Sequence, residues 1–402
     1  MAASADAHAL ASLSRAFSHL PEPGWRPSQS VPLEVWAGLS MAEESLWDRC
    51  ALFFSKSLLL PSRRSRVVAI HINNTGVQGA LPRELAGGRG KHRHALNQLR
   101  DLILRNNAIH GTIPSSIGKL RNCRTINLAG NRLKGPLPAA IRQLQRLTLF
   151  DVHSNALSGC LSEQCAAMRL HRLRSLKFLI IGENDFTGPF PCEVLKCSWL
   201  IELHLSGLRL DGALPSFSNM ESIQVLDLSS NQFTGIIPPF SPVHCPMIRD
   251  LRLHRNRLSG SLPPGISHLR YITRLDFSRN LLSGDMGVIA WGRQNNSESG
   301  ATGGMGQHAF DEVCGDYPCH HGCMGNLTTL TSLSLAHNKI RGTLSPGLAD
   351  LANLTFCDVR STKIACNSST MTILSQIALL CVGRAMRIIL LFVSSHDNLQ
   401  CS

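Results

Sequence analysis

The sequence predicts an α/β solenoid, a right-handed coil of about eleven short repeats with a parallel, concave β-sheet along one side. A unit of about 24 residues returns along most of the chain, which is the first sign of such an array. Each unit contains one alternating apolar pair, and in eight units an asparagine follows that pair. Leu, Ile and Val supply most apolar residues and only 2 Tyr are present, which suits thin stacked repeats better than one thick core.

The alternating pair predicts a short strand in every unit. In Leu102 and Leu104, or Leu226 and Leu228, the two apolar side chains point inward and the residues beside them point outward. The asparagine that follows satisfies backbone groups of the neighbouring turn at a buried corner. These corner asparagines are Asn107, Asn131, Asn155, Asn184, Asn231, Asn256, Asn280 and Asn338. Leu208, Thr75 and Thr362 replace them in three units, and we expect weaker corners there.

A turn and an edge segment follow each corner. The pattern Leu-x-Gly-x-Ile/Leu-Pro recurs, as in residues 258 to 263. Gly permits a tight turn, and Pro favours an extended edge that cannot join a central strand.

On these residues the sequence resembles the plant-type subfamily of leucine-rich repeats, found in plant receptor ectodomains, polygalacturonase inhibitors and surface antigens of trypanosomatid parasites. The resemblance covers residues 67 to 364, in about eleven units. It implies a leucine-rich-repeat solenoid with no kinase domain. It says much less about function, because function lies in sites grafted on the fold.

The pattern divides the chain into five parts. We expect a helical N-terminal cap over 1–66, repeats over 67–286, an insert at 287–322, the last repeats over 323–366, and a cap or apolar tail over 367–402. The cap is predicted from Leu10, Leu13, Phe17 and Leu20 on one helical face of residues 7 to 20. It resembles the cap of plant-type repeat proteins but lacks their usual paired cysteines. The first repeat needs such a cover for its apolar edge.

The C-terminal tail favours a cap over a membrane span. Residues 371 to 393 are mostly apolar, but Arg384 and Arg387 fall inside them. A charge near the bilayer centre costs about 2.5 to 3.5 kcal/mol, so a spanning helix is marginal. Membrane association through this tail stays an alternative.

The outward residues of the strands form the default binding surface of such a solenoid. Their central column consists of His71, Ile103, Asn127, Asp151, Ile180, His204, Asp227, Arg252, Asp276, Ser334 and Asp358. Flanking positions add Arg105, His153, His254, Arg255, Arg274, Arg279, His337 and Arg360. The ligand-binding residues we predict are Arg252, His254, Arg255, Arg274, Asp276, Arg279, Asp227 and His204. The aspartates also have an ordinary explanation, since Leu-Asp-Leu-Ser is the commonest version of this unit in the family.

The basic members of this set have two interpretations. Arg252, His254, Arg255, Arg274 and Arg279 come from two adjacent strands, where neighbours stand within about 5 Å. In the first interpretation, these basic side chains bind a carboxylate, phosphate or sulfate by charge-assisted hydrogen bonds. Alternatively, Asp250 and Asp276 neutralise them and the face is merely solvated.

The insert over residues 287 to 322 is a second candidate site, because long loops on a rigid scaffold often carry recognition. It resembles the island segment of some plant receptor ectodomains. Cys314, Cys319, His320 and Cys323 offer a weak zinc site, but two separated Cys-x2-Cys units are missing. A local disulfide or free thiols are the alternatives, and we predict no cofactor.

The cellular compartment has opposing indications. The N-terminus shows no basic segment followed by an apolar stretch, so no secretory signal is predicted. Five sequons begin at Asn73, Asn295, Asn326, Asn353 and Asn367, and they are glycosylated only in a secreted chain. Among the 14 Cys, Cys123 and Cys357 occupy buried Leu positions and are expected to be core thiols. The close pairs Cys160/Cys165 and Cys192/Cys197 leave a disulfide open, because spacing does not establish geometry.

The function that the sequence predicts is recognition without catalysis. No phosphate-binding Gly loop, kinase signature, Gly-x-Ser-x-Gly elbow or His-Glu-x-x-His helix occurs. The net charge of +13 favours acidic partners, but the basic run at residues 87 to 94 lacks aromatics for base stacking, so nucleic acid is disfavoured. We expect a receptor-ectodomain-like protein, at the cell surface or secreted, that binds a protein, peptide or acidic glycan. The alternative is an intracellular scaffold for protein partners.

Overall fold

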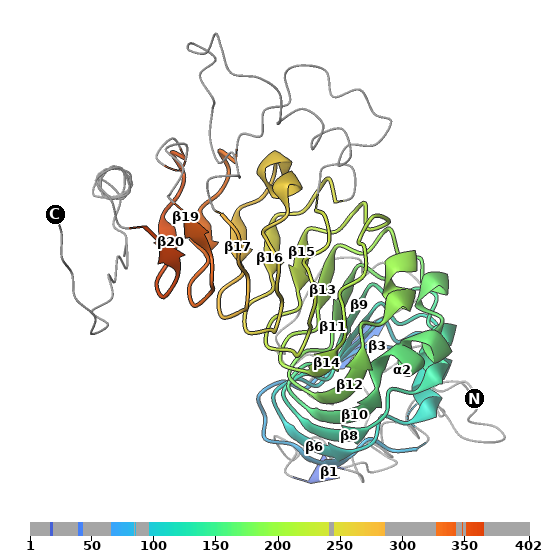
Figure 1. The fold of residues 1–402 in the computed structure, drawn as a ribbon. Coiled ribbons are helices and arrows are strands. Elements are labelled where there is room, and N and C mark those ends of the chain that lie inside the picture. The colour runs from blue at the N-terminus through green and yellow to red at the C-terminus, as the bar shows by residue number, and fades with distance from the viewer. Residues whose placement is uncertain are drawn as a thin grey trace. The chain divides into compact units, whose positions relative to one another are not determined.

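The fold is a stack of short parallel strands, one per repeat, as Figure 1 shows. The computed structural model describes residues 17–18, 39–42, 66–83, 85, 96–240, 245–285, 327–342, 348 and 351–365. The chain separates into two compact units, Met1–Arg209 and Leu210–Ser402, and each is described by itself. This architecture confirms the predicted leucine-rich-repeat solenoid.

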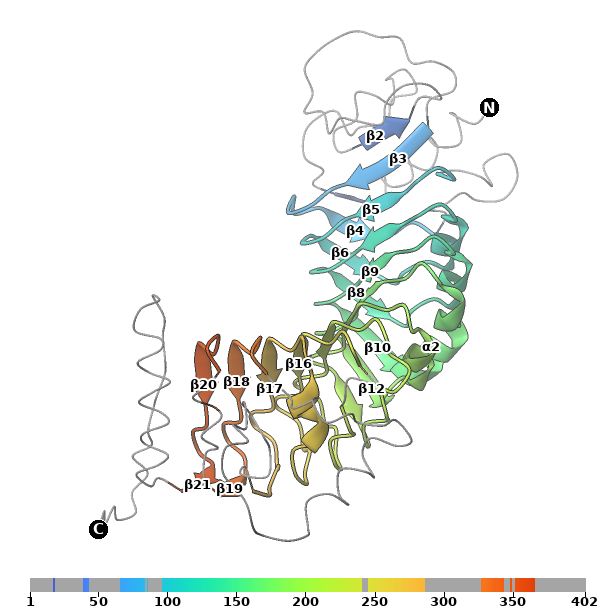
Figure 2. The same cartoon turned by 90° about the horizontal axis from the view of Figure 1, so that it is seen from above.

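The first unit is built on a sheet that we call the main sheet, with strand order β2-β3-β5-β7-β9-β11-β13 (Figure 2). Its strands are β2 (Leu39–Ala42), β3 (Arg66–His71), β5 (Asp101–Ile103), β7 (Thr125–Asn127), β9 (Leu149–Asp151), β11 (Phe178–Ile180) and β13 (Glu202–His204). All pairs are parallel except β2 with β3, which is antiparallel. Parallel strands arise because every repeat returns to the same starting point before the next strand begins.

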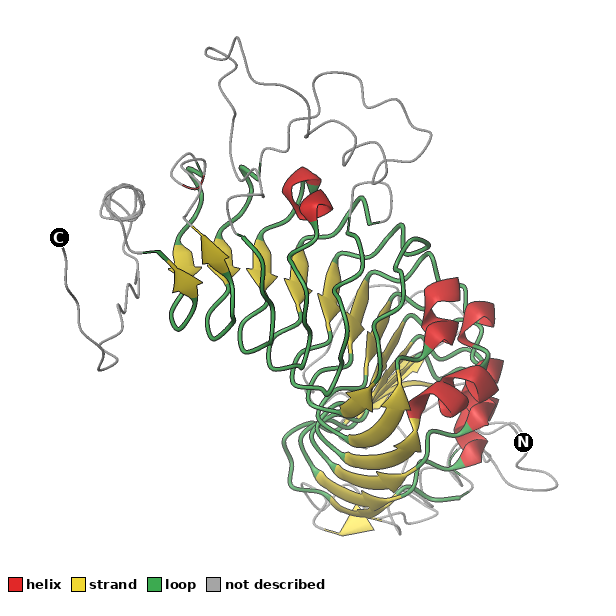
Figure 3. Ribbon diagram, in the orientation of Figure 1, coloured by secondary structure: helices red, strands yellow, loops and turns green. Residues whose placement is uncertain are grey.

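A second sheet follows the corners of the same unit. Its strands are β1 (Phe17–Ser18), β4 (Gln78–Ala80), β6 (Ala108–Gly111), β8 (Arg132–Gly135), β10 (Ala156–Cys160) and β12 (Asp185–Pro189). The helices are the 3-10 turns η4 (Ser115–Lys119), η5 (Ala139–Gln143), η6 (Leu170–Arg172) and η7 (Cys192–Lys196), and the α-helix α2 (Leu161–Met168). Figure 3 shows these helices gathered along one side of the unit. Most begin directly after the proline that ends the corner pattern.

The N-terminal cap differs in part from the prediction. Phe17–Ser18 form strand β1, which pairs antiparallel with β4, instead of ending the helix expected over residues 7 to 20. Strand β2 pairs antiparallel with β3 at the start of the main sheet. A paired strand satisfies the open N–H and C=O groups at a sheet edge, which a helix does not do. The rest of that expected helix lies outside the described residues.

The second unit continues the same design. Its main-sheet strands are β15 (Val225–Asp227), β16 (Asp250–Arg252), β17 (Arg274–Asp276), β18 (Ser332–Ser334) and β20 (Phe356–Asp358), all parallel. Strands β19 (Arg341–Gly342) and β21 (Lys363–Ile364) pair at the last corners, and η8 (Pro264–His268) is its 3-10 turn. Strand β14 (Arg209–Asp211) spans the point in the chain at which this unit begins.

The core of each unit is the inward column of the main sheet. Leu102, Ile126, Leu226 and Leu251 are all 0% exposed. Cys123 and Cys357 are buried in the same core, which confirms their predicted positions. Burying each such side chain stabilises the fold by roughly 1.5 to 3 kcal/mol.

The corner asparagines bind one repeat to the previous one, as predicted. Asn131 donates from Nδ2 to the carbonyl oxygens of Leu104 (2.9 Å) and Leu128 (3.0 Å), and its Oδ1 accepts from the backbone N–H of Ile109 (3.0 Å). Hydrogen bonds of the same kind to the preceding repeat are formed by Asn107, Asn155, Asn184, Asn256, Asn280 and Asn338. At the predicted weaker corner Thr362, the hydroxyl donates to Val359 within its own repeat (2.7 Å).

The residue before each corner adopts a left-handed backbone conformation. In the first unit this position holds small or amide residues in most repeats, including Gly130 (φ 63°), Ser154 (φ 52°) and Asn106 (φ 55°). In the second unit it holds Ser230, His337 and Ser361, and also Arg255 (φ 54°) and Arg279 (φ 56°). Such a conformation is uncommon for residues other than Gly and Asn, so the two arginines stand out.

Several predicted segments lie outside the described residues. These are the insert at 287–322 and the tail at 367–402, with the residues Cys314, Cys319, His320 and Cys323. In the part of the chain that the structure describes, no helix is both long and apolar enough to span a membrane.

Candidate ligand-binding face

The register of the main sheet sets out the candidate face. In the second unit, Asp227, Arg252, Asp276, Ser334 and Asp358 are paired in one row across five strands. In the first unit, His71, Ile103, Asn127, Asp151, Ile180 and His204 form the corresponding row. Both rows are the central outward column that the sequence predicts, because a side-chain period of two fixes which residues share a face.

Arg252 is held in place by two carboxylates. Its Nε and Nη2 donate to Asp250 at 3.0 Å and 2.5 Å, and its Nη1 lies 3.7 Å from Oδ2 of Asp227. The hydrogen bond to Asp250 raises the pKa of the guanidinium above its ordinary value. Two nitrogens of the guanidinium are thus occupied by Asp250, and the third faces Asp227.

The carboxylate of Asp276 on β17 lies close to side chains from both β17 and the end of β16. Its Oδ1 accepts from the backbone N–H (3.2 Å) and hydroxyl (2.7 Å) of Ser278. Its Oδ2 lies 3.4 Å from Nδ1 of His254 and 3.7 Å from Nη2 of Arg274. These distances bring two of the predicted site residues, His254 and Arg274, together around the carboxylate of a third, Asp276.

Two polar atoms beside Asp276 are buried without a hydrogen bond. Within the described residues these are Nδ1 of His254, which lies at ion-pair distance from Asp276, and Nε of Arg274. A buried polar atom without a hydrogen bond costs about 1 to 3 kcal/mol, so the arrangement around Asp276 is not optimised for stability alone.

The aspartates of the row also brace the backbone. Asp227 Oδ1 accepts from the backbone N–H (3.0 Å) and hydroxyl (2.6 Å) of Ser229, the arrangement that Asp276 makes with Ser278. Asp358 receives the guanidinium of Arg360. Sequence reasoning missed this brace, although the Asp-x-Ser spacing at the ends of β15 and β17 was its visible signal.

Three of the predicted residues lie away from this centre. Arg255 and Arg279 come three residues after the ends of β16 and β17, at the corner rather than on the strands. His204 lies in the first unit on β13, where its Nε2 is 3.4 Å from Oε2 of Glu202. The structure thus assembles Asp227, Arg252, His254, Arg274 and Asp276 at one place.

The first unit has its own polar contact on this face. Asp151 Oδ1 is 2.7 Å from Nδ1 of His153, and Asp151 Oδ2 accepts from Asn127 Nδ2 at 2.9 Å. The hydrogen bond to Asp151 raises the pKa of His153, and burial opposes it only in part. A carboxylate with an amide donor on its other oxygen favours a protonated imidazole.

The described cysteines are all free thiols. Cys160 is half-buried, Cys192 is exposed, and Cys165 and Cys197 are buried, so the disulfides left open for these pairs do not form. Cys123, Cys245 and Cys357 are buried as well. Burial raises the pKa of Cys123 and Cys357 to about 12, which keeps both thiols protonated at neutral pH.

The structure describes two of the five predicted glycosylation sequons. Asn73 is half-buried and accepts from the Arg105 backbone N–H (3.3 Å), whereas Asn353 is exposed and donates to Thr328 O (2.6 Å). Asn295, Asn326 and Asn367 lie outside the described residues. Among the residues that are described, no cluster of three His, Cys, Asp or Glu side chains is arranged for a metal ion.

Comparison with known proteins agrees with the fold. The family model of the Leucine Rich Repeat matches residues 98–120, 122–144, 222–242, 247–269 and 329–351. Pollen receptor-like kinase 2 of Arabidopsis thaliana is 38% identical over 123 residues, which are 30% of this chain and 18% of that protein. This chain therefore spans less than a fifth of that relative.

Solved structures show the same architecture. The plant peptide hormone receptor RGFR1 in complex with RGF2 superposes with a TM-score of 0.54 and 25% identity, over 71% of this chain and 42% of that chain. A plant ice-binding protein superposes with a TM-score of 0.54 and 21% identity, over 90% and 87% of the two chains. At that lower identity the likeness concerns the fold alone.

The stacked strands, the corner asparagines and the matched repeats define the class by its architecture: the chain carries leucine-rich repeats that stack into a solenoid. Its relatives by sequence are plant receptor-like proteins and receptor kinases, and its structural neighbours include plant receptor ectodomains.

Proposed function

We propose that the protein is a non-enzymatic recognition protein that binds a protein or peptide through the outward face of the second unit. In this proposal it acts as a receptor ectodomain does, at the cell surface or after secretion. The observation that carries the proposal is the set of fixed polar groups around Asp276, which lies in register with Arg252 on the neighbouring strand.

The charge balance of this face favours a peptide over a purely anionic ligand. Asp227, Asp250 and Asp276 lie against Arg252 and Arg274, so the guanidinium groups are largely neutralised. Neutralised donors suit backbone carbonyls and mixed side chains better than a run of negative charge.

The polar side chains around Asp276 are partly buried, which favours ligands that match their hydrogen-bonding groups. The side chain of Arg252 is 29% exposed and that of His254 is 25% exposed, so a ligand would displace little water there. The side chain of Arg274 is 42% exposed, so its guanidinium would donate a hydrogen bond to an acceptor of the ligand.

Relatives support the class of ligand. RGFR1, a plant peptide hormone receptor solved in complex with RGF2, shares the fold of this chain. The ice-binding protein with the same fold shows that the scaffold alone does not fix a ligand. The residues at the face must therefore carry the specificity.

The test is selection from a displayed random peptide library against the full chain, followed by binding to variants. Arg274→Gln and His254→Asn each remove a group of the proposed centre and keep a polar side chain of similar length. We expect each to weaken selected peptides by about tenfold, since a lost hydrogen bond to a charged group is worth roughly 1.5 kcal/mol. The control is Arg142→Gln, an exposed residue of η5 in the first unit.

Two outcomes would overturn the proposal. One is that no peptide enriches above a control selection on immobilised albumin. The other is that enriched peptides bind both centre variants as tightly as they bind the original chain. Circular dichroism of each variant establishes that it is folded before its affinity is interpreted.

An intracellular scaffold is the second candidate, and one observation favours it. Seven described cysteines are free, and five of these thiols are buried. Free thiols persist in reducing compartments, whereas extracellular chains usually pair them. Glycosidase treatment of the protein from its native source separates the two, since only a secreted form shifts in mobility through sequons such as Asn353.

A further inference from the structure

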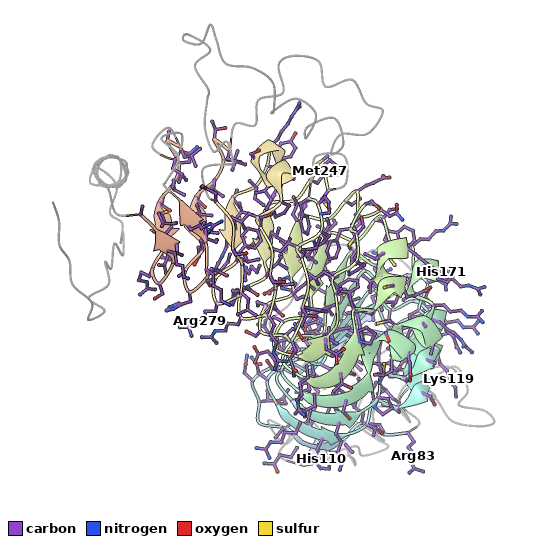
Figure 4. All side chains as sticks on the ribbon, viewed as in Figure 1. Arg83, His110, Lys119, His171, Met247 and Arg279 are labelled. Carbon is purple, nitrogen blue, oxygen red and sulfur yellow. The ribbon has the colours of Figure 1, made fainter. Side chains whose placement is uncertain are left out.

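One edge of the second unit carries an unbalanced row of positive charge. We define the basic edge as Arg255, Arg257, Arg279, Lys339, Arg341 and Lys363, all exposed and all within the corners that follow the main-sheet strands. His337 lies in the same row as Arg279 and is exposed too. Figure 4 shows Arg279 at this edge and Met247 at the opposite edge of the unit.

Hydrogen bonds between the corners fix the spacing of the charges. The backbone N–H of Arg255 donates to Ser278 O (2.9 Å), and that of Arg279 donates to Ala336 O (2.7 Å). Arg341 and Lys363 are paired in register on β19 and β21. Successive positions are therefore about 4.8 Å apart, the distance between neighbouring strands. The charges form rows along the stack of repeats.

The backbone conformation at the corners does not require arginine at positions 255 and 279. Arg255 and Arg279 hold left-handed backbone conformations, which glycine and asparagine adopt more readily. At the equivalent position most other described corners hold Asn, Gly or Ser, and Glu183 and His337 are the exceptions. Residues kept in an unfavourable conformation point to a role other than folding.

The charge of this edge is not neutralised by ion pairs among the residues of the unit that the structure describes. None of the six side chains forms an ion pair with any residue that the structure describes, in contrast to Arg252 on β16 and Arg360 just after β20. Asp285, whose backbone bridges to Arg341, is the one acidic residue that lies among them in the described corners from Arg255 to Lys363. The field of the edge therefore favours a negatively charged partner.

We propose that the basic edge binds a linear acidic polysaccharide. A chain of regularly spaced carboxylates or sulfates matches rows of cations that repeat along the solenoid. A base-stacking platform for single-stranded nucleic acid is missing, because the six positions include no aromatic residue. This surface is separate from the centre around Asp276, so the inference does not rest on the proposed function.

Binding of the full chain to polygalacturonate, dextran sulfate and neutral dextran tests the inference, measured by titration calorimetry at rising salt. The edge variant combines Arg255→Ser, Arg279→Ser and Lys339→Gln. These replacements are residues that the chain itself has at the equivalent corners, namely Ser230, Ser361 and Gln232. The fold should therefore tolerate them. A control variant with Arg121→Ser, Arg142→Ser and Arg146→Gln removes three exposed cations from the first unit.

We expect the original chain and the control variant to bind at least one acidic polysaccharide, and neither to bind neutral dextran. The edge variant should have a Kd raised about tenfold or more, and its Kd should depend less steeply on salt. Equal losses in both variants would assign the binding to net charge alone and overturn the inference. So would tighter binding to single-stranded DNA or to phosphatidylserine vesicles than to either polysaccharide.

Discussion

The Nδ2 atom of Asn131 lies 2.9 Å from the carbonyl oxygen of Leu104, in the repeat before its own. The same carboxamide accepts from the N–H of Ile109 at 3.0 Å, so one side chain bridges two consecutive repeats. Asn131 is 8% exposed, and water does not replace these bonds easily.

Removing this bridge should loosen the array. We expect Asn131→Ala to lower the free energy of unfolding by about 2 to 3 kcal/mol, because buried backbone groups lose their partners. Urea titration followed by circular dichroism measures it. The control is Gln145→Ala, whose exposed amide bonds only its own turn, with an expected change within about 0.5 kcal/mol. Equal effects in the two variants would refute the bridging role.

Substitution of a corner glycine tests how strongly the fold requires the left-handed conformation there. Gly130 has φ of 63°, and a Cβ there would stand 2.3 Å from Oδ1 of Asn106. We expect Gly130→Ala to cost about 2 to 3 kcal/mol, from backbone strain and displacement of that side chain. Gly76→Ala is the matched control, because φ is 69° but no atom lies within 4 Å of the added Cβ. Its cost should be about 1 kcal/mol, and thermal melting compares the two.

The inward column makes a third prediction. Leu226 is 0% exposed on β15, and Leu226→Asp places an unpaired charge in the core. The variant should lose several kcal/mol of stability. Val225→Asp, one residue earlier and half-buried on the outward side, should cost about 1 kcal/mol through repulsion by the neighbouring Asp250. An unchanged melting temperature for Leu226→Asp would contradict the assignment of the core.

The sequence predicts the fold well where one physical rule acts on every repeat. Alternation places Asp227, Arg252 and Asp276 in one outward row, and the structure confirms their register. The antiparallel strands β1 and β2 escaped prediction, because they are used once, at the end of the array, and repeat no pattern. The grouping of His254 and Arg274 around Asp276 was only in part foreseeable, since it depends on side-chain rotamers that periodicity does not set.

His153 should give the protein a pH-dependent stability. Its hydrogen bond to Asp151 raises the pKa of the folded imidazole above 6.5, its ordinary value. The protonated form is thus favoured in the folded chain, so the stabilisation is complete below about pH 6 and is lost as pH rises through the folded pKa. The side chain is 44% exposed, and solvent screening limits the effect to about 1 kcal/mol or less.

Urea unfolding at pH values from about 5 to 9 measures this dependence. His153→Gln should flatten part of the decline at rising pH. His110→Gln is the control, because His110 is exposed and contacts no carboxylate among the described residues. A steeper decline in His153→Gln than in the original chain would reverse the sign and refute the assignment.

Thiol reactivity distinguishes the buried cysteines from the surface ones. Cys192 is exposed, whereas burial raises the pKa of Cys123, Cys245 and Cys357 to about 12. A thiolate is the reactive form, so at neutral pH the buried groups lack both access and charge. Treatment of the folded chain with a maleimide should modify Cys192 first and leave those three unmodified, as peptide mass mapping would show. After unfolding in urea all four should react at similar rates, which verifies that folding alone protects them. Modification of Cys357 in the folded chain as fast as Cys192 would mean that the last repeat opens readily, because its core cannot admit the reagent otherwise.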